Sequence, residues 1–408
     1  MKILFIAHYF QPEPNFFFGL PFAQELSQRG HEVEVLTGFP NYPGGKLYPG
    51  YHQHWKMVEE MNGIRITRVP LYPSHDQSAI KRIISYSSLA LTQALAGISY
   101  RFKADVAYVC QGPATIGLPA IVFKGLKGVP FVYQIQDLWP DSLSATGMFD
   151  SGLGMKLLHN WCKLVYRKAA HITVIAPGMK EKLLERGVPA EKVSVLFNWC
   201  DEQALLTPAH TDSDWLERLL PSDSFNILYA GNLGNAQALE TVIQTAVMLQ
   251  QEPGIRFVLV GNGIAKEKLQ ALAAQKQLRN VFFHPRVSAG EAGKLLQKSD
   301  VVLTHLRREP LFDITIPSKI QAYLAAGRPI LAAAGRDAGD LVEKAGAGIK
   351  VTPENPEEMA RAVLKFRRMG KEKLQEMGNR GREFYYRELS FSVGVSHFEQ
   401  LFEQARRK

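Results

Sequence analysis

Short apolar runs alternate with helical patterns through the first half of the chain. The runs read KILFIA, EVEVLT, VAYVC, FVYQI, ITVIA and VSVLF. WKMVEEMNGIRITRV adds two strands around Asn62-Gly63, a pair typical of a tight hairpin turn. Strands separated by helices predict a parallel, doubly wound α/β sheet. The first half therefore predicts one Rossmann-like domain.

The alternation restarts after a polar, turn-rich stretch. The strand patterns here are FNILYA, RFVLVG, VFFHP, VVLTHL and ILAAA, and one of the helical patterns between them runs from Ala238 to Gln251. A chain of 408 residues exceeds the length at which a single core stops growing, so a second Rossmann-like domain is predicted. In open α/β sheets ligands bind beyond the carboxyl ends of the strands, so we expect two domains facing a cleft.

We divide the chain into four parts on this pattern. Residues 1–200 form the first Rossmann-like domain, 201–224 an interdomain linker and 225–383 the second Rossmann-like domain. The last part, 384–408, is a helical segment that we expect to pack back towards the first domain.

Charge and composition limit the kinds of binding partner and the cellular compartment that we expect. The net charge of +9 favours anionic partners, but no nucleic-acid signature accompanies it. Three cysteines without CxxC or histidine spacing indicate reduced thiols rather than disulfides or zinc. Met1-Lys2 leads directly into ILFIA, which is too short for the core of a signal peptide, so we expect a cytoplasmic protein.

The stretch LFDITIPSKIQAYLAAGRPI, from Leu311 to Ile330, predicts a tight loop that opens a helix. Thr315 and Ser318 supply capping oxygens, and Lys319 stands in the first turn. A helix start presents unpaired N–H groups and a partial positive charge, and an adjacent lysine adds to that field. The stretch predicts a phosphate site; an ordinary helix cap with a solvated, exposed lysine is the alternative.

Two glycine turns follow predicted strands in the same half of the chain. The residues concerned are Gly231, Asn232 and Gly234 after FNILYA, and Gly261, Asn262 and Gly263 after RFVLVG. Such turns let the backbone approach a phosphate, but the spacing is not GxGxxG and no acidic residue follows where a dinucleotide site needs one. Together with Lys319 they favour a nucleoside diphosphate over a dinucleotide cofactor. Tight turns without a ligand are the alternative.

The other candidate site residues follow strands of the first half. Asp137 and Asp141, in QDLWPDSLSATG, either lie on the cleft side or cap the next helix. The loop QPEPNFFFG contains Phe17 and Gly19, and its three phenylalanines need another domain, a membrane, an apolar ligand or the following helix to cover them. His8, near the end of the first strand, is either a catalytic or hydroxyl-binding group or a structural one.

One DxD pattern, which some sugar-nucleotide enzymes use to hold a divalent metal, occurs at 212–214. It lies in the polar linker, so we interpret it as solvated surface. The cleft-side loops do not resemble an oxygen cage for Mg²⁺ or Mn²⁺. We therefore expect no metal site and no cofactor besides the donor substrate.

Six segments, in this order, carry a family resemblance: PEP, RGHEVEVLTGFPNYPGGK, QDLWPDSLSATG, VLFNW, YAGNLGNAQALE and FDITIPSKIQAYLAAGRPI. With them the chain resembles the family 4 glycosyltransferases of the GT-B fold, in particular the WbuB-like type, over essentially its whole length. The resemblance implies retaining, metal-independent transfer of a sugar from a nucleoside diphosphate to an acceptor hydroxyl. It also implies that the domain at 1–200 binds the acceptor and the domain at 225–383 binds the nucleotide sugar. By position, Lys319 and the Gly231 turn would face the diphosphate and the Gly261 turn the nucleotide. Asn198, in VLFNW, would lie where the chain crosses between the domains.

The sequence departs from the wider family at three sets of positions, one of which is Gln136, in place of the frequent His before Asp137. Ile314 and Ala322 stand where relatives have two glutamates eight residues apart, so the usual ribose clamp is missing and Asp313 is a candidate to bind a donor-sugar hydroxyl instead. Asn232 and Gln237 replace phosphate-binding Arg and Lys. The lysine at the helix start would therefore bear more of the phosphate charge.

We predict a glycosyltransferase that builds a bacterial surface polysaccharide such as O-antigen or capsule. Its candidate catalytic residues are Lys319, Asp137 and Asp313. The expected donor is a UDP-sugar carrying an N-acetylated amino or deoxy sugar, and the expected acceptor is a glycan or a polyprenyl-diphosphate-linked glycan. A GT-B sugar-nucleotide epimerase and a non-catalytic partner subunit are the alternatives.

The segment KRIISYSSLALTQALAGISYRFK, at 81–103, is too short and too polar to span a bilayer. Basic residues flank its apolar middle, which fits a helix lying at an anionic membrane surface. A buried helix of the first domain gives the same pattern. We therefore keep both a peripheral location on the inner face of the membrane and a core helix as expectations.

Overall fold

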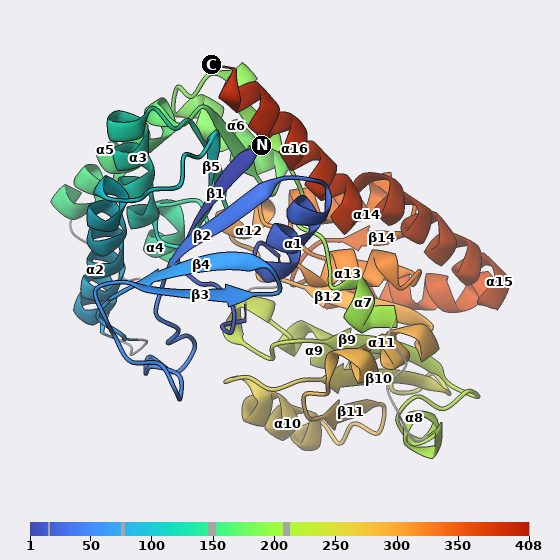
Figure 1. The fold of residues 1–408 in the computed structure, drawn as a ribbon. Coiled ribbons are helices and arrows are strands. Elements are labelled where there is room, and N and C mark those ends of the chain that lie inside the picture. The colour runs from blue at the N-terminus through green and yellow to red at the C-terminus, as the bar shows by residue number, and fades with distance from the viewer. Residues whose placement is uncertain (15–16, 75–77, 146–151, 207–212, 408) are drawn as a thin grey trace. The chain divides into compact units, whose positions relative to one another are not determined.

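The computed structural model describes residues 1–14, 17–74, 78–145, 152–206 and 213–407 (Figure 1). The chain forms two compact units. Unit 1 comprises Met1–Phe197 with Gly394–Lys408, and unit 2 comprises Asn198–Val393. The segment expected to be a linker, 201–224, falls within unit 2, where α7 (Glu202–Leu206) packs against α11 (Ala289–Lys298).

Unit 1 contains an eight-stranded sheet in the order β3-β4-β2-β1-β5-β6-β7-β8. The strands are β1 (Lys2–Ala7), β2 (Glu32–Gly38), β3 (Met57–Met61), β4 (Ile64–Val69), β5 (Val106–Gln111), β6 (Phe131–Ile135), β7 (His171–Val174) and β8 (Val193–Val195). Every strand is parallel to its neighbour except β3, which pairs antiparallel with β4. Their turn places Asn62 and Gly63 at φ values of 50° and 80°, which confirms the predicted hairpin.

Helices connect these strands. They are α1 (Leu20–Gln28), α2 (Ala79–Ile98), α3 (Gly117–Lys127), α4 (Asp141–Ala145), α5 (Gly152–Lys168) and α6 (Pro177–Glu185), with short 3₁₀ turns η1 (Ala114–Ile116) and η2 (Ala190–Lys192). The central strand β1 is buried from its second residue onwards, so its alternating side chains meet a hydrophobic layer on each face. No described helix is long and apolar enough to cross a membrane.

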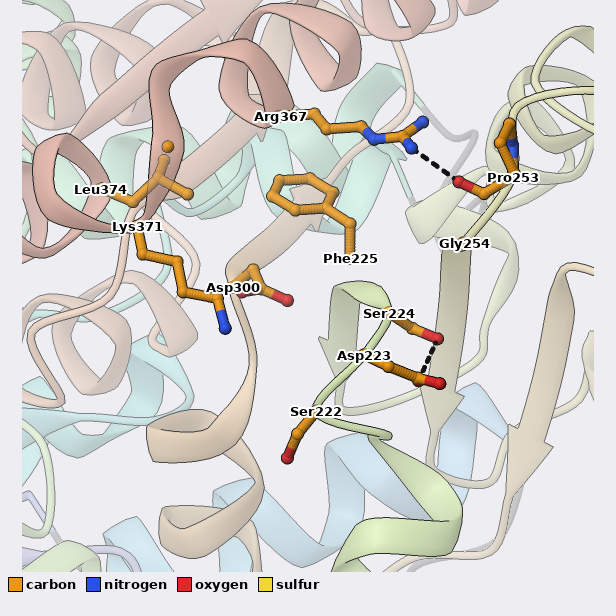
Figure 2. A pocket seen from close by; sticks show the side chains of 11 residues that line it. Ser222, Asp223, Ser224, Phe225, Pro253, Gly254, Asp300, Arg367, Lys371 and Leu374 are labelled. Carbon is orange, nitrogen blue, oxygen red and sulfur yellow. Dashed lines mark hydrogen bonds between the residues drawn. The ribbon is translucent and has the colours of Figure 1, made fainter.

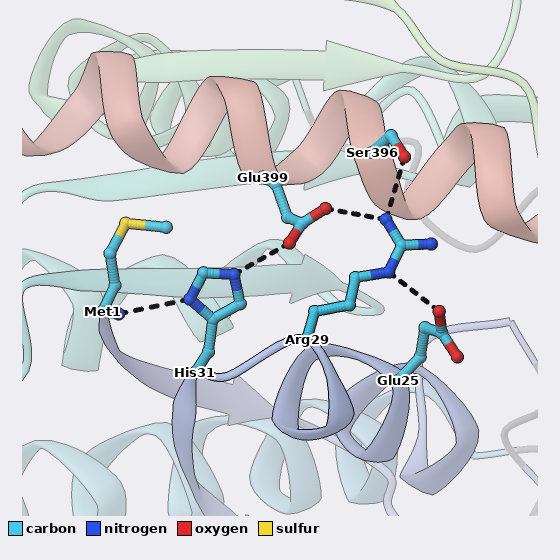
Figure 3. Close-up of polar contacts among 6 residues, drawn as sticks. All are labelled: Met1, Glu25, Arg29, His31, Ser396 and Glu399. Carbon is cyan, nitrogen blue, oxygen red and sulfur yellow. Dashed lines mark hydrogen bonds and ion pairs between the residues drawn. The ribbon is translucent and has the colours of Figure 1, made fainter.

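The C-terminal helix α16 (Phe391–Arg406) returns to unit 1, as predicted (Figure 3). The Arg29 guanidinium donates to the Ser396 hydroxyl at 2.8 Å and pairs with the Glu399 carboxylate at 2.7 Å. A ring nitrogen of His31 lies 2.8 Å from the other oxygen of that carboxylate. Phe398 adds apolar contact, since its ring centre lies 5.2 Å from that of Phe22. The C-terminal helix is thus held on unit 1 by contacts with residues near the N-terminus.

Unit 2 contains a six-stranded sheet in the order β11-β10-β9-β12-β13-β14, with every pair parallel. The strands are β9 (Phe225–Ala230), β10 (Ile255–Val260), β11 (Val281–His284), β12 (Val301–His305), β13 (Ile330–Ala333) and β14 (Gly348–Val351). Numbered from β9, this order is 3-2-1-4-5-6, the doubly wound arrangement of a Rossmann domain. The prediction of two Rossmann-like domains is confirmed, although the short strand β14 was not predicted.

The helices of unit 2 lie on both sides of its sheet. Besides α7 and α11 they are α8 (Ser213–Leu219), η3 (Asn235–Gln237), α9 (Glu240–Met248), α10 (Lys266–Gln275), α12 (Pro310–Asp313), α13 (Lys319–Ala325), α14 (Arg336–Lys344) and α15 (Pro356–Glu388). The helix predicted from Ala238 begins two residues later, because Ala238 itself adopts a left-handed conformation with φ 41°. The hydrophobic core includes Val242 of α9, Phe257 of β10 and Val363 of α15.

Candidate functional site

The two glycine turns of unit 2 form one continuous structure. They follow β9 and β10, which are neighbours beside the point where the strand order reverses. The Gly231 N–H donates to the Val260 carbonyl at 2.9 Å, and the Leu233 N–H donates to the Asn262 carbonyl at 2.9 Å. The structure therefore brings the two predicted turns together at the carboxyl edge of the sheet, where α/β proteins bind ligands.

Close backbone packing explains two of these glycines. Gly261 and Gly263 have φ values of 152° and 157°. A Cβ atom at Gly261 would overlap the carbonyl oxygen of Gly231, and one at Gly263 would overlap that of Leu233. Both positions need glycine for the contact between the turns. A role of this turn in nucleotide binding stays a prediction.

Lys319 is the first residue of α13 and lies under the first turn. A Cβ atom at Gly231 would stand 2.9 Å from its Nζ, and that Nζ lies 3.6 Å from the centre of the Tyr229 ring. The side chain is partly exposed, but its Nζ is buried and has no hydrogen-bond partner among the described residues. Burial lowers the pKa of Lys319 to about 7. The alternative of a solvated, exposed lysine is therefore wrong.

The predicted helix cap is also wrong in its details. Ser318 is the residue before α13, but its side chain makes no capping hydrogen bond. The Thr315 hydroxyl donates to the Leu311 carbonyl at 2.7 Å instead, which ties the loop to α12. The helix does end where predicted, before Gly327, whose φ is 67°.

The side chains that replace Arg and Lys of relatives bond to each other. The Gln237 side-chain oxygen accepts from the Gly234 N–H at 3.1 Å and from the Asn232 amide at 3.4 Å. One N–H group expected to face a diphosphate is thus occupied within the turn. Asn262 accepts from the Lys266 ammonium at 3.2 Å, so the second turn also carries a cation at the start of α10.

Tyr229 and His305 shape this region, and the sequence analysis missed both. The Tyr229 hydroxyl donates to the Asn232 carbonyl at 2.6 Å. His305 is buried, with Nδ1 2.8 Å from the Gln237 carbonyl and Nε2 3.2 Å from the Glu354 N–H. Burial lowers the pKa of His305 to about 4, so the ring is neutral. Both residues lie at or near the carboxyl ends of strands, β9 and β12, and this position in the sequence could have indicated them as site residues.

Asp313 lies at the end of α12, on the connection that follows β12. It is exposed, and Gly335 packs closely against its backbone. That connection leaves the carboxyl end of a strand next to β9, so Asp313 lies on the same edge of the sheet as the glycine turns. A contact with a donor sugar stays a prediction.

Unit 1 has a cavity of about 270 Å³ at the carboxyl ends of its central strands. Three predicted residues line it together: His8, Phe17 and Asp137. Tyr42 and Cys110 are further wall residues that the sequence analysis did not assign to a site. The structure thus brings together candidates from two separate loops, since His8 and Phe17 follow β1 and Asp137 follows β6.

The titratable groups of this cavity are held in uncharged surroundings. His8 is buried, with its ring edge-on to Tyr9 and to Tyr86 at 4.3 and 5.2 Å. Burial lowers the pKa of His8 to about 3, so the imidazole is neutral and can hydrogen-bond a hydroxyl but is a weak base. Asp137 is exposed at the rim, yet loss of solvent around its carboxyl raises its pKa.

Three other predicted residues do not line this cavity. Asp141 forms an ion pair with Arg186, which also donates to the Trp139 carbonyl at 3.1 Å, so Asp141 fixes the start of α4. Gly19 is the residue before α1, and its carbonyl accepts from the Ala23 N–H at 3.2 Å. Asn198 is buried as the first residue of unit 2.

Two rings of the phenylalanine loop, Phe17 and Phe18, line the cavity. Phe18 is also buried beside Phe22 and Phe398, with ring centres 6.0 Å from each. Packing under neighbouring helices therefore covers one of the three rings. Phe16 lies outside the described residues.

A buried carboxylate, Glu13, holds this loop in place. It accepts hydrogen bonds from the N–H groups of Asn41 and Tyr42, both at 2.8 Å, and of Phe10 at 3.2 Å. Burial outweighs these bonds and the nearby Arg68, and raises the pKa of Glu13. Glu13 thus positions Tyr42 in the cavity wall.

Unit 2 also has a cavity of about 270 Å³, which lies at the end of its sheet opposite the glycine turns (Figure 2). It surrounds Phe225, the first residue of β9, and Asp300, which precedes β12. The Arg367 guanidinium donates there to the Pro253 carbonyl at 2.7 Å. Because the glycine turns lie at the carboxyl ends of these strands, this cavity is separate from the predicted donor site.

Within the described parts of the chain, no group of three or more His, Cys, Asp or Glu side chains could hold a metal ion. Asp212 of the DxD pattern lies outside those parts. Metal independence of the reaction stays a prediction. The three cysteines are free thiols, two of them buried.

Comparison with known proteins decides the family. Residues 20–199 match the glycosyl transferase 4-like domain, and residues 215–384 match the glycosyl transferases group 1 domain. The putative colanic acid biosynthesis glycosyl transferase WcaI of Escherichia coli is 31% identical over 348 residues, which cover 83% of this chain and 84% of WcaI. The chain belongs to the family 4 type of GT-B glycosyltransferases. It is accordingly an enzyme of the hexosyltransferase type.

Other relatives of this glycosyltransferase agree in family and fold. The probable glycosyltransferase WbjE of Pseudomonas aeruginosa is 23% identical and covers 76% of the chain and 82% of WbjE. Among solved structures, HepE of Anabaena in complex with UDP is similar with a TM-score of 0.66 at 15% identity, over 99% of this chain and 100% of that chain. A sucrose-phosphate synthase of Thermosynechococcus elongatus has a TM-score of 0.70 at 15% identity, over 99% of each chain. These two structures share the GT-B fold.

Proposed function

We propose that this glycosyltransferase moves a sugar, with retention, from a UDP-sugar to a glycan or a polyprenyl-diphosphate-linked glycan. The observation that carries the proposal is the buried Nζ of Lys319, which lies beneath the Gly231 turn without a hydrogen-bond partner among the described residues. A buried amine without a partner is unfavourable unless a ligand compensates for it. A diphosphate at the turn supplies the missing negative charge.

The chemistry requires stabilisation of the leaving diphosphate. As the bond between the sugar's anomeric carbon and the phosphate oxygen breaks, negative charge grows on the diphosphate. Lys319 and the N–H groups at the start of α13 are fixed beside that position, so they favour the transition state without reorganising. The acceptor oxygen then bonds to the anomeric carbon on the same face, and its proton passes to the departing phosphate oxygen. This route needs no protein nucleophile.

The names of similar proteins support the donor and the pathway. HepE was crystallised with UDP and with UDP-glucose, and WcaI is named for colanic acid biosynthesis. We accordingly propose a UDP-sugar donor, with an N-acetylated amino or deoxy sugar, and a role in making a bacterial surface polysaccharide such as O-antigen or capsule. We place the reaction in the cytoplasm, at the inner face of the membrane, where a polyprenyl-linked acceptor is held.

The acceptor is assigned to the cavity of unit 1. A neutral His8 offers a hydrogen-bonding ring nitrogen for a sugar hydroxyl, Phe17 offers an apolar face, and Asp137 offers a carboxylate at the rim. Asp313 is proposed to bind a hydroxyl of the donor sugar, because it is exposed on the same sheet edge as the glycine turns.

A ligand screen tests the proposal. Thermal unfolding is measured with UDP, GDP, ADP and the corresponding sugars, and UDP compounds should give the largest increase in the unfolding temperature. The UDP-sugar that binds is then incubated with and without a glycan acceptor, and the products are analysed by NMR. A new α- or β-linkage of the same configuration as the donor supports retaining transfer. An epimerised donor formed without acceptor would indicate an epimerase, and no nucleotide binding at all would indicate a non-catalytic subunit.

A further inference from the structure

Helix α2 exposes an apolar stripe along its outer side. The residues are Ile80, Ile84, Leu91, Leu95 and Ile98, with Ile83 beside them, and their exposed fractions lie between 41 and 70%. Spacings of three, four and seven residues place the first five within one narrow sector of the helix. The opposite side of α2 is buried, including Leu89, Gln93 and Ala96. The helix is therefore packed on its domain and still presents a hydrophobic face.

A second helix of unit 1, α5, also exposes apolar side chains. Helix α3 packs against both α2 and α5, as Figure 1 also shows. Leu153 and Leu157 of α5 are 72 and 61% exposed, and their spacing of four residues places them on one side of the helix. Exposed apolar area on several adjacent elements is unusual for a surface in contact only with water.

The charge of these three helices has a single sign. Their sequences contain eight basic residues, two in α2, two in α3 and four in α5, and no Asp or Glu. Lys81, Lys156 and Lys163 are exposed. If two copies of this chain paired through this surface, equal positive charges would oppose each other with no carboxylate between them. An anionic lipid surface satisfies both the charge and the apolar stripe.

We propose that the α2-α5 surface, defined by these exposed Ile, Leu and Lys side chains, docks on an anionic phospholipid bilayer. The helix lies in the plane of the headgroups, with its isoleucines and leucines towards the acyl chains. Docking brings the cavity of unit 1 to the membrane, because Tyr86 on the inner side of α2 has its ring 5.2 Å from that of His8. The inference extends the proposed location of the enzyme, but its test does not depend on catalysis.

The test is flotation of the full-length protein with phosphatidylcholine vesicles, prepared with and without phosphatidylglycerol. We expect binding only to the anionic vesicles, with a decrease at high salt. The double variant Leu91→Ser with Leu95→Ser interrupts the apolar stripe, and Lys156→Glu with Lys163→Glu reverses the charge beside it. Each double variant should lower the bound fraction at least about fivefold, because apolar burial and attraction to anionic lipid both contribute to binding. Ile264→Ser with Lys276→Glu is the matched control in unit 2, since Ile264 is 83% exposed, and should bind like the unchanged protein.

Unchanged unfolding temperatures of the variants show that they are folded, and a UDP-induced shift equal to that of the unchanged protein shows that the donor site is intact. A protein that floats with neither vesicle overturns the proposal, as does binding that both surface variants retain. If light scattering instead finds a dimer that Leu91→Ser with Leu95→Ser dissociates, the surface is a contact between copies and the lipid proposal is wrong. Failure of UDP binding together with normal flotation would count against the proposed function alone.

Discussion

Lys319 keeps its ammonium nitrogen 3.6 Å from the centre of the Tyr229 ring. The same tyrosine donates its hydroxyl hydrogen to the Asn232 carbonyl, so one side chain supports both the lysine and the glycine turn above it. The ring face attracts a cation, but burial of the amine has the larger effect and lowers the pKa of Lys319. In the free protein the Lys319 amine is therefore positioned to bind an anion but contributes little to stability.

Replacing Lys319 by Met should separate activity from stability. Methionine retains the length of the side chain but lacks the charge, so kcat/KM should fall about 10²-fold or more, as expected when a fixed charge stabiliser is removed. The unfolding temperature should stay equal or rise, because a buried amine without a hydrogen-bond partner is replaced by an apolar group. Steady-state kinetics and calorimetry measure the two effects. Lys276→Met, at an exposed position, is the control, and unchanged turnover of Lys319→Met would remove this residue from the donor site.

Donor binding should depend on pH through the same residue. The pKa of Lys319 lies at about 7 in the free protein, below its ordinary value of 10.5, so the amine is mostly neutral above pH 7. A bound diphosphate favours the ammonium, and binding above pH 7 must therefore take up a proton. UDP affinity should fall by up to about tenfold per pH unit above pH 7 and level off below it. Calorimetry in buffers of different ionisation enthalpy measures this uptake, which Lys319→Met should abolish.

The stability of the free protein should depend on pH in the opposite direction to UDP affinity. Between pH 7 and 10.5 the unfolded chain binds a proton at Lys319 more tightly than the folded protein does. The contribution of this residue to the free energy of unfolding therefore increases as the pH rises through that window. Comparison of the unchanged protein with Lys319→Met by chemical denaturation at several pH values isolates the effect. An identical pH dependence of both proteins would contradict a buried amine.

Gly261→Ala should disturb the donor site from within the fold. A Cβ atom there would overlap the Gly231 carbonyl, and φ is 152°, so the turn above Lys319 must move. We expect a loss of UDP affinity together with a lower unfolding temperature. Gly50→Ala is the control, because Gly50 also has a positive φ of 84° but has no atom within 4 Å of an added Cβ. Equal effects of both substitutions would show that backbone strain, rather than contact between the turns, is responsible.

The sequence predicted the succession of secondary-structure elements better than the surroundings of individual side chains. The hairpin at Asn62-Gly63, the strands other than β14 and both glycine turns followed from local patterns, because turn residues and periodicity act over a few positions. The burial of the Lys319 amine did not, since it depends on Tyr229 and Gly231, which are far from it in the sequence. The same holds for Asp141, whose ion pair with Arg186 crosses 45 residues. Sequence patterns predict which residues are polar, but tertiary contacts decide which of them remain available to a ligand.

Transfer should survive excess EDTA. Lys319 and backbone N–H groups are proposed to balance the diphosphate charge that a divalent cation balances in other enzymes. The assay measures release of UDP with and without chelator, and then after addition of Mg²⁺ or Mn²⁺. Loss of activity with EDTA that manganese restores would contradict metal independence and would direct attention to Asp137 or Asp313.

Glu13 should matter for the stability of unit 1 and for its cavity. Its carboxylate accepts hydrogen bonds from three backbone N–H groups, those of Phe10, Asn41 and Tyr42. Glu13→Ala leaves these buried donors without an acceptor and should lower the free energy of unfolding by about 3 kcal/mol. Glu13→Gln should have a smaller effect, because one oxygen remains.

Chemical denaturation measures these losses, and Glu185→Ala provides the control, since the Lys182–Glu185 ion pair is exposed and adds little stability. UDP affinity should not change in either Glu13 variant, because the glycine turns and Lys319 belong to unit 2. Acceptor affinity should decrease, because Tyr42 would no longer be fixed in the cavity wall. If Glu13→Ala weakened UDP binding but not acceptor binding, the assignment of the unit 1 cavity to the acceptor would be wrong.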